Sequence, residues 1–164
     1  MKLRFIATIF TFMLMTIVSA AEIRMPDITQ TVTKTPIAED VSIDDAIESL
    51  IERAIELNFK FVGHQKISET FKRLGLPNVR RIEIFQFCKP EVAKLLIEHN
   101  INLAAYMPCR ITLVEDKDGQ AWFVTANLDI ILKSAKLPEK VLKMGLKVHK
   151  QLREVVEAGA NGDF

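Results

Sequence analysis

The sequence predicts an α+β fold in which helices pack on one face of a mainly antiparallel sheet. Apolar residues recur with helical spacing in two segments, 43–54 and 138–158. Residues 80–87 alternate with the spacing of a strand and are rich in β-formers. An Asp-Gly pair lies between two further β-rich runs, which is typical of an antiparallel hairpin.

The first residues have the three-part layout of a secretory signal peptide. Lys2 and Arg4 precede an uncharged apolar stretch, residues 5–18, and small residues follow it. A retained membrane anchor is the alternative, but this stretch is shorter than the roughly 20 apolar residues that span a bilayer as a helix. We expect cleavage after Ala20, with Ala21 an equally acceptable last residue. The mature chain would then be periplasmic or secreted, without a membrane span.

The length and net charge of the chain limit the kinds of function that it can have. What remains after cleavage has the size of one ordinary domain. Cleavage removes two basic residues, so the 22 basic and 21 acidic residues of the whole chain become 20 and 21. A near-neutral chain without a long basic run argues against nucleic-acid binding, which depends on Lys and Arg at the phosphates.

The first half of the chain predicts an edge segment, a helix and a strand. Residues 21–40 read as a linker that leads into a possible edge strand. Ser42 is typical of a helix N-cap, because two acidic residues follow it in the first turn. The run 58–67 alternates, which places Phe59, Phe61 and Gly63 on one face of a strand and His64 on the other.

The remaining elements are predicted from the spacing of apolar residues and from the proline, glycine and capping residues at their ends. They are a helix that Ser68 caps and that ends at Gly75, a strand at 80–87, a helix from Pro90 to about Asn100, hairpin strands at 109–115 and 120–125, and helices at 128–135 and 138–158. The last residues, 159–164, have nothing to bury, so we expect a mobile tail.

Cys88 and Cys109 are the two cysteines of the chain. An oxidising compartment allows such a pair to form a disulfide, but the spacing does not show whether the two thiols meet. Cys88 precedes a predicted helix, whose dipole can lower the pKa of a thiol and make it reactive. Buried thiols or a structural disulfide, a reactive pair and a metal-binding pair all stay open. The chain has no C-x-x-C motif, so a thioredoxin-type site is not supported.

The histidines, His64, His99 and His149, lack the spacing of common metal sites. His64 follows a glycine, which lets a ligand approach an imidazole that titrates near neutrality. A half-exposed strand histidine is the simpler interpretation, and metal or haem binding through His64 and a cysteine is the alternative. No nucleophile elbow, phosphate-binding loop or paired carboxylates are present, so we expect a binding protein rather than an enzyme. The sequence identifies no cofactor.

Two surface features have both a functional and a simpler interpretation. The aromatic residues suit the lining of an apolar pocket, although such residues most often form core. The last predicted helix has a basic side that suits an anionic membrane surface or an acidic partner, but glutamates interrupt it and a solvated face is the simpler interpretation. Its basic residues are Lys140, Lys143, Lys147, Lys150 and Arg153.

Two cysteine-proline marks connect the sequence to a known family. Cys88–Pro90 forms a cysteine-x-proline turn, and Pro108-Cys109 begins a predicted strand, with a helix between the two marks. On these marks the chain resembles the domain-of-unknown-function 302 family from about Val41 to Leu132. The resemblance implies a compact α+β fold of the TATA-binding-protein-like class, often a homodimer, and no known reaction. Lys89 departs from the asparagine or aspartate that is common in that turn.

We therefore expect an exported homodimeric module that binds a small molecule or a periplasmic protein partner. A redox or sulfur-handling protein is the first alternative, and metal or haem binding is the second. The candidate pocket residues lie at the two cysteine marks or near them in the predicted sheet; they are Cys88, Cys109, Pro108, His64, Phe87 and Tyr106. The predicted division is a signal peptide (1–20), a linker or edge segment (21–40), the family domain (41–135), a C-terminal helix (136–158) and a flexible tail (159–164).

Overall fold

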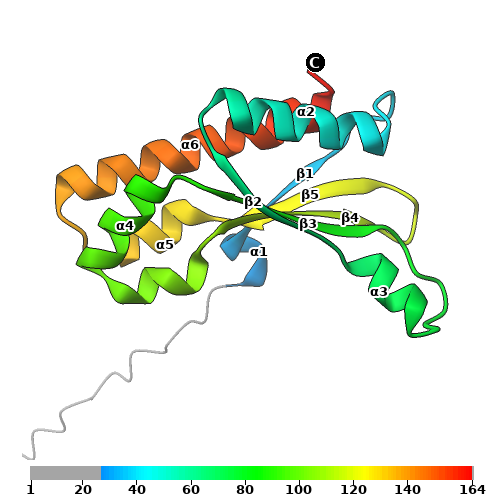
Figure 1. Ribbon diagram of the computed structural model, residues 1–164, viewed down its shortest axis with the longest axis horizontal. Coiled ribbons are helices and arrows are strands. Elements are labelled where there is room, and N and C mark those ends of the chain that lie inside the picture. Colours follow the sequence, from blue (N-terminus) through cyan, green and yellow to red (C-terminus); the bar gives the residue numbers. More distant parts are fainter. Residues whose placement is uncertain (1–26, 164) are drawn as a thin grey trace, which may run out of the picture.

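The computed structural model describes residues 27–163, so the predicted signal peptide and its cleavage site lie outside the described residues. The chain folds around a five-stranded sheet whose order is β1-β5-β4-β3-β2 (Figure 1). All four strand pairings are antiparallel, which confirms the predicted α+β fold. The strands are β1 (Val32–Pro36), β2 (Lys60–Lys66), β3 (Ile82–Cys88), β4 (Cys109–Glu115) and β5 (Ala121–Ala126).

The helices lie on one face of the sheet and at its two ends. They are α1 (Ile28–Thr31), α2 (Ile43–Glu56), α3 (Ile67–Arg73), α4 (Pro90–His99), the 3-10 helix η1 (Ile101–Tyr106), α5 (Leu128–Ser134) and α6 (Glu139–Asn161). The helices α2 and α6 lie side by side over the same face (Figure 1). The helices α4 and α5 lie near one end of the strands and α3 near the other (Figure 1).

The first long helix forms where its sequence predicts it. The Ser42 hydroxyl accepts a hydrogen bond of 3.1 Å from the Asp45 backbone N–H, which caps α2. Its buried face repeats every four residues, at Ala46, Leu50 and Ala54. The predicted cap of the next helix is wrong, because α3 begins at Ile67 with Lys66 as its N-cap.

The core lies between the sheet and α2 and α6. Every second residue of β3, β4 and β5 is buried, which is the pattern of a sheet covered on one face. The fully buried side chains on this face include Phe85, Phe87, Ile111, Leu113 and Phe123. Burying each such side chain stabilises the fold by roughly 1.5–3 kcal/mol relative to an exposed one.

The segment predicted as a linker or edge strand contains an ordered edge of the sheet. β1 pairs with β5 in register, with Thr33 opposite Thr125 and Thr35 opposite Phe123. The short helix α1 precedes β1 within the same segment. The threonines on β1 therefore lie on the face that α6 covers.

The prediction of a mobile tail after residue 158 is wrong. α6 continues to Asn161, and Ala158 and Ala160 are only 3% and 2% exposed. The Ala160 carbonyl accepts a hydrogen bond of 2.9 Å from the Ala38 backbone N–H. The small side chains at the end of α6 are buried because they let α6 approach α2 closely.

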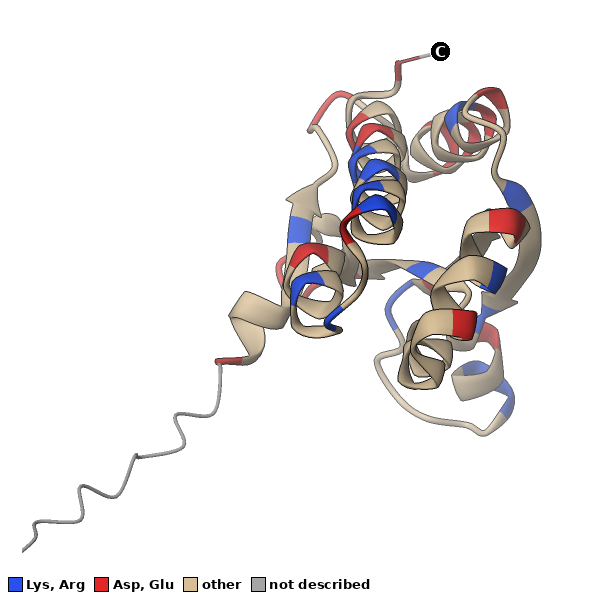
Figure 2. Ribbon diagram, turned by 90° about the vertical axis from the view of Figure 1, so that its left-hand side faces the viewer, with Lys and Arg blue, Asp and Glu red and all other residues tan. Residues whose placement is uncertain are grey.

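Acidic residues lie among the basic residues along α6 (Figure 2). Lys143 pairs with Glu139 at 2.6 Å, four residues apart on the helix surface. Arg153 pairs with Glu157 at 3.3 Å, again four residues apart. Such exposed pairs each stabilise a helix by roughly 0.2–0.5 kcal/mol. In the stretch from 27 to 163, no helix combines the length and apolar character needed to span a membrane.

Candidate functional site

The two cysteines lie at the same end of adjacent strands as free thiols. Cys109 begins β4 and pairs with Phe87, the residue before Cys88 at the end of β3. Successive side chains in a strand point to opposite faces, so Cys88 faces away from the covered side on which Cys109 and Phe87 lie. The fold thus brings the two predicted residues near each other without joining them.

The electrostatic surroundings of both thiols disfavour the thiolate form. Burial raises the pKa of Cys109 to about 11, and the neighbouring Cys88 adds to the increase. Burial also raises the pKa of Cys88, with a further contribution from the Glu91 carboxylate in the first turn of α4. The expected lowering of the Cys88 pKa by the helix dipole is therefore outweighed.

Slow alkylation of both native thiols is the expected result. At pH 8, iodoacetamide should modify Cys109 about a hundredfold more slowly than an unfolded cysteine, because only the thiolate reacts. Peptide mass spectrometry of timed samples, with the urea-unfolded chain as control, measures both rates. Modification of either native thiol as fast as in urea would contradict this and favour the redox alternative.

The other predicted pocket residues divide into two groups. Tyr106 and Cys109 line the same cavities, at the end of the sheet near η1. Pro108 lies directly between their elements and follows a cis peptide bond. Phe87 is fully buried and packs against the rings of Phe59 and Phe61, so it belongs to the core.

His64 lies away from both cysteines and on the face opposite to the one predicted. A β-bulge between Phe61 and Gly63 adds one residue to β2, and the alternation reverses after it. His64 consequently pairs with Phe85 and stacks on its ring, with the ring centroids 4.4 Å apart. Cys109 is two strands away from His64, so the structure does not assemble the predicted site of His64 and a cysteine. Among residues 27–163, no group of three or more His, Cys, Asp or Glu side chains suits a metal ion.

The imidazole of His64 belongs to a hydrogen-bonded network of polar side chains that reaches α2. Its Nε2 donates to Glu83, with 2.5 Å between Nε2 and Oε2. Arg81 donates from Nε to the other oxygen of Glu83 at 2.6 Å and from Nη2 to Asp44 at 2.7 Å. Glu83 is 4% exposed, so these two donors compensate a buried carboxylate. Because the network connects β2, β3 and α2, the role of His64 in it is structural.

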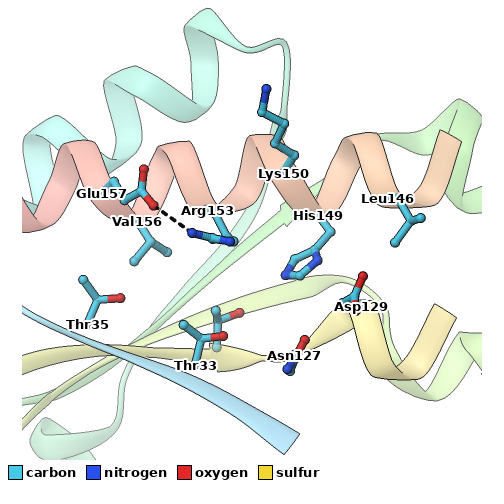
Figure 3. Close-up of a pocket in the computed structure, with 11 residues that line it drawn as sticks. Thr33, Thr35, Asn127, Asp129, Leu146, His149, Lys150, Arg153, Val156 and Glu157 are labelled. Carbon is cyan, nitrogen blue, oxygen red and sulfur yellow. Dashed lines mark hydrogen bonds and ion pairs between the residues drawn. The ribbon is translucent and has the colours of Figure 1, made fainter. Parts of the chain in front are cut away.

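A cleft of about 540 Å³ lies between α6 and the edge of the sheet formed by β1 and β5 (Figure 3). It forms because the covered face carries short side chains here, Thr33, Thr35 and Thr125, where the centre of the sheet carries phenylalanine and leucine. α6 contributes His149 and Arg153, four residues apart on one side of the helix.

His149 has an unmatched polar atom in this cleft. Its Nε2 is buried and has no hydrogen-bond partner within the described residues. In Figure 3 the ring points from α6 toward Asn127 and Asp129. Burial lowers the pKa of His149; Arg153 adds to the decrease and Asp129 opposes it. The ring is therefore neutral at pH 7, so it presents one N–H donor and one acceptor.

The charged side chains around the cleft each have a partner of opposite charge. Arg153 donates to Glu157 at 3.3 Å, and Asp129 accepts from Lys133 at 2.7 Å. Lys150 points away from the strands in Figure 3. The hydroxyls of Thr33 and Thr35 make no hydrogen bond to another described residue. The uncommitted groups of the cleft thus include the hydroxyls of Thr33 and Thr35 and the neutral imidazole of His149.

The family comparison agrees with this architecture. Residues 33–159 match the family model described as domain of unknown function DUF302. The chain belongs to the DUF302 family. The match extends beyond the predicted limits of Val41 and Leu132, and it includes α6, which the sequence analysis had placed outside the family domain.

A solved DUF302 structure shows the same fold. The crystal structure of an uncharacterized conserved DUF302 protein from Bacillus stearothermophilus superposes with a TM-score of 0.67 at 15% sequence identity. The similarity covers 78% of this chain and 97% of that protein. No match was found among the curated proteins.

The cleft of this DUF302 chain was not predicted from the sequence. Its lining comes from β1, β5, α5 and α6, which no local pattern connects. One signal was present in the sequence: threonines alternate at positions 31, 33 and 35 in a run that pairs at the sheet edge. His149 on the otherwise regular α6 was the second, because a histidine beside the apolar face of a helix marks a polar space beneath it.

Proposed function

We propose that this DUF302 protein is an exported, non-enzymatic binding module that holds a small neutral polar molecule, such as a polyol or a monosaccharide, in the cleft under α6. One observation carries the proposal: the buried Nε2 of His149 has no partner among the described residues and faces a cleft of about 540 Å³. A buried polar atom without a partner costs about 1–3 kcal/mol, which a ligand hydroxyl would offset.

The chemistry of the lining supports a neutral ligand rather than an ion. Arg153 and Asp129 already have partners of opposite charge, so an ion would have to compete with these pairs. A hydroxyl both donates and accepts, which matches a neutral imidazole and the hydroxyls of Thr33 and Thr35. The volume also lies within the roughly 300–1,000 Å³ that is common for ligand sites.

Titration of a panel of polyols and monosaccharides tests the proposal. At least one compound should bind the mature chain in calorimetry at pH 7, and His149→Phe should weaken its binding about tenfold, the effect of one buried hydrogen bond. Without ligand, the same variant should be about 1 kcal/mol more stable to urea, because the unmatched atom is gone.

His99→Phe is the matched control. His99 lies exposed at the end of α4 and its Nδ1 contacts only the Leu95 carbonyl among described residues, so the substitution should leave binding unchanged. Two results would refute the proposal: no compound of the panel binds and native mass spectrometry finds no copurifying small molecule, or His149→Phe binds as tightly as the unchanged chain.

The proposal keeps export and a homodimer as expectations from the sequence. The charged start, the apolar stretch 5–18 and the small residues after it support export, and N-terminal sequencing of the mature protein tests the cleavage after Ala20. The family resemblance supports a homodimer, and sedimentation equilibrium tests it. The redox alternative is not favoured, because burial raises the pKa of both thiols.

A further inference from the structure

Two cavities lie beside Cys109, and the outer one shares the lining residue Thr125 with the cleft under α6. The inner one has a volume of about 50 Å³ and lies among α4, η1, α5 and α6. The outer one has a volume of about 250 Å³ and lies at the end of β4 and β5. Tyr106, Cys109 and Leu128 line both, so the two cavities adjoin along the same three side chains.

The inner cavity is apolar on nearly all sides. Its further lining residues have hydrocarbon or thioether side chains, or none; they are Leu96, Leu103, Met107, Ile131, Leu132, Gly145 and Val148. Gly145 keeps the space open, because a Cβ there would lie 3.0 Å from a methyl carbon of Leu132. A cavity of this kind excludes water and accepts apolar groups.

One cation lines the outer cavity, from the sheet face opposite to that of Cys109. Arg110 lines it and is exposed, and its guanidinium has no ion pair or hydrogen bond to another described residue. No carboxylate lines either cavity, so Arg110 is the single charged lining group. The pair of cavities therefore combines an apolar inner cavity with an outer cavity that carries one positive charge, unlike the cleft under α6, whose charges are balanced.

We propose that this second site binds an aliphatic carboxylate. The hydrocarbon chain fills the inner cavity toward Gly145, and the carboxylate pairs with Arg110 in the outer cavity. The volume of the two cavities is close to the lower limit of roughly 300 Å³ for ligand pockets, which favours a short or medium chain over a long one. Apart from Thr125, the residues that line this site differ from those that line the cleft under α6.

Calorimetry with a homologous series of carboxylates separates the contribution of the hydrocarbon chain to the affinity from that of the carboxylate. Affinity should increase about fourfold for each CH₂ from butanoate to octanoate, and then level off when the chain fills the cavity. Octanol, which lacks the charge, should bind about fivefold more weakly than octanoate, because an exposed ion pair is worth up to about 1 kcal/mol.

The cysteines provide a reporter that needs no substitution. At pH 9, octanoate at ten times its dissociation constant should slow the alkylation of Cys109 about tenfold, because Cys109 lines both cavities. Cys88 lines neither, so its alkylation should not change, which makes it an internal control. Equal rates for Cys109 with and without octanoate would overturn the proposal.

Two matched variants locate the carboxylate. Arg110→Gln should weaken octanoate about fivefold and leave octanol unchanged, whereas Arg80→Gln, at an exposed arginine that lines neither cavity, should leave both unchanged. Both sites are exposed, so neither substitution threatens folding. The proposal would also be overturned if Arg110→Gln left octanoate binding intact. It would likewise be overturned if His149→Phe abolished octanoate binding, because octanoate would then bind in the cleft under α6.

Discussion

Gly159→Ala should lower the free energy of unfolding by about 2 kcal/mol, although alanine is the better helix former. A Cβ at position 159 would lie 2.9 Å from Cβ of Leu50 and 3.0 Å from the carbonyl oxygen of Ala46, both in α2. Neither atom can rotate away, because Ala46 and Leu50 are fully buried and one of the two contacts is backbone. Overpacking of this kind typically costs 1–3 kcal/mol, and urea unfolding measures it.

Gly145→Ala is the matched control on the same helix. Its Cβ would lie 3.0 and 3.1 Å from the methyl ends of Leu132, which can turn aside, and at an ordinary contact distance of 3.5 Å from Cδ2 of Leu96. The gain in helix propensity of up to about 1 kcal/mol then offsets the contact, so stability should hardly change. If Gly159→Ala instead stabilised the chain, the end of α6 would not pack against α2 and the mobile tail predicted from the sequence would be correct.

Local patterns predicted the elements whose signals are contained within a few residues. The predicted hairpin strands 109–115 and 120–125 correspond to β4 and β5, because strand alternation and an Asp-Gly turn are both local. The capped helix after Ser42 was predicted for the same reason. The end of α6 was not, because burial of small side chains depends on how closely another helix approaches.

The bulge in β2 shows what a strand pattern omits. Plain alternation placed His64 opposite Phe61, but the extra residue at Val62 brings both to one face. A Cβ at position 63 would lie 2.7 Å from Oε1 of Gln86 on β3, so the glycine leaves room for the end of that side chain. The face of His64 therefore depends on its partner strand, and a single-strand pattern does not contain that information.

The candidate site was predicted only in part. Tyr106 and Cys109 do line a common cavity, since both belong to the segment where η1 leads into β4. The cleft under α6 joins β1 to a helix more than a hundred positions later in the chain, so its residues become neighbours only after the sheet order is known. A site between elements distant in sequence is set by topology rather than by spacing.

Arg81→Met should lower the free energy of unfolding by about 3 kcal/mol at pH 7. The substitution leaves Glu83, 4% exposed, with His64 as its remaining side-chain partner among the described residues. A buried charge that loses its partner costs about 3–5 kcal/mol; the lower value applies because the Arg81 side chain is 32% exposed. The double variant Arg81→Met/Glu83→Gln should recover about half of the loss, because no buried charge remains.

The effect should depend on pH with a definite sign. Burial raises the pKa of Glu83, but the hydrogen bonds and charges of Arg81 and His64 outweigh burial and leave this pKa below its ordinary value. A lowered pKa contributes stability that is fully present above the unfolded value of about 4.3 and is lost as the pH falls through the folded value. The difference in stability between the unchanged chain and Arg81→Met should therefore shrink between pH 5 and pH 3 in urea titrations. Arg80→Met, at an exposed neighbour, should stay within about 0.5 kcal/mol of the unchanged chain throughout. A constant difference for Arg81→Met across this pH range would show that Arg81 acts by packing and that Glu83 is already neutral in the folded protein.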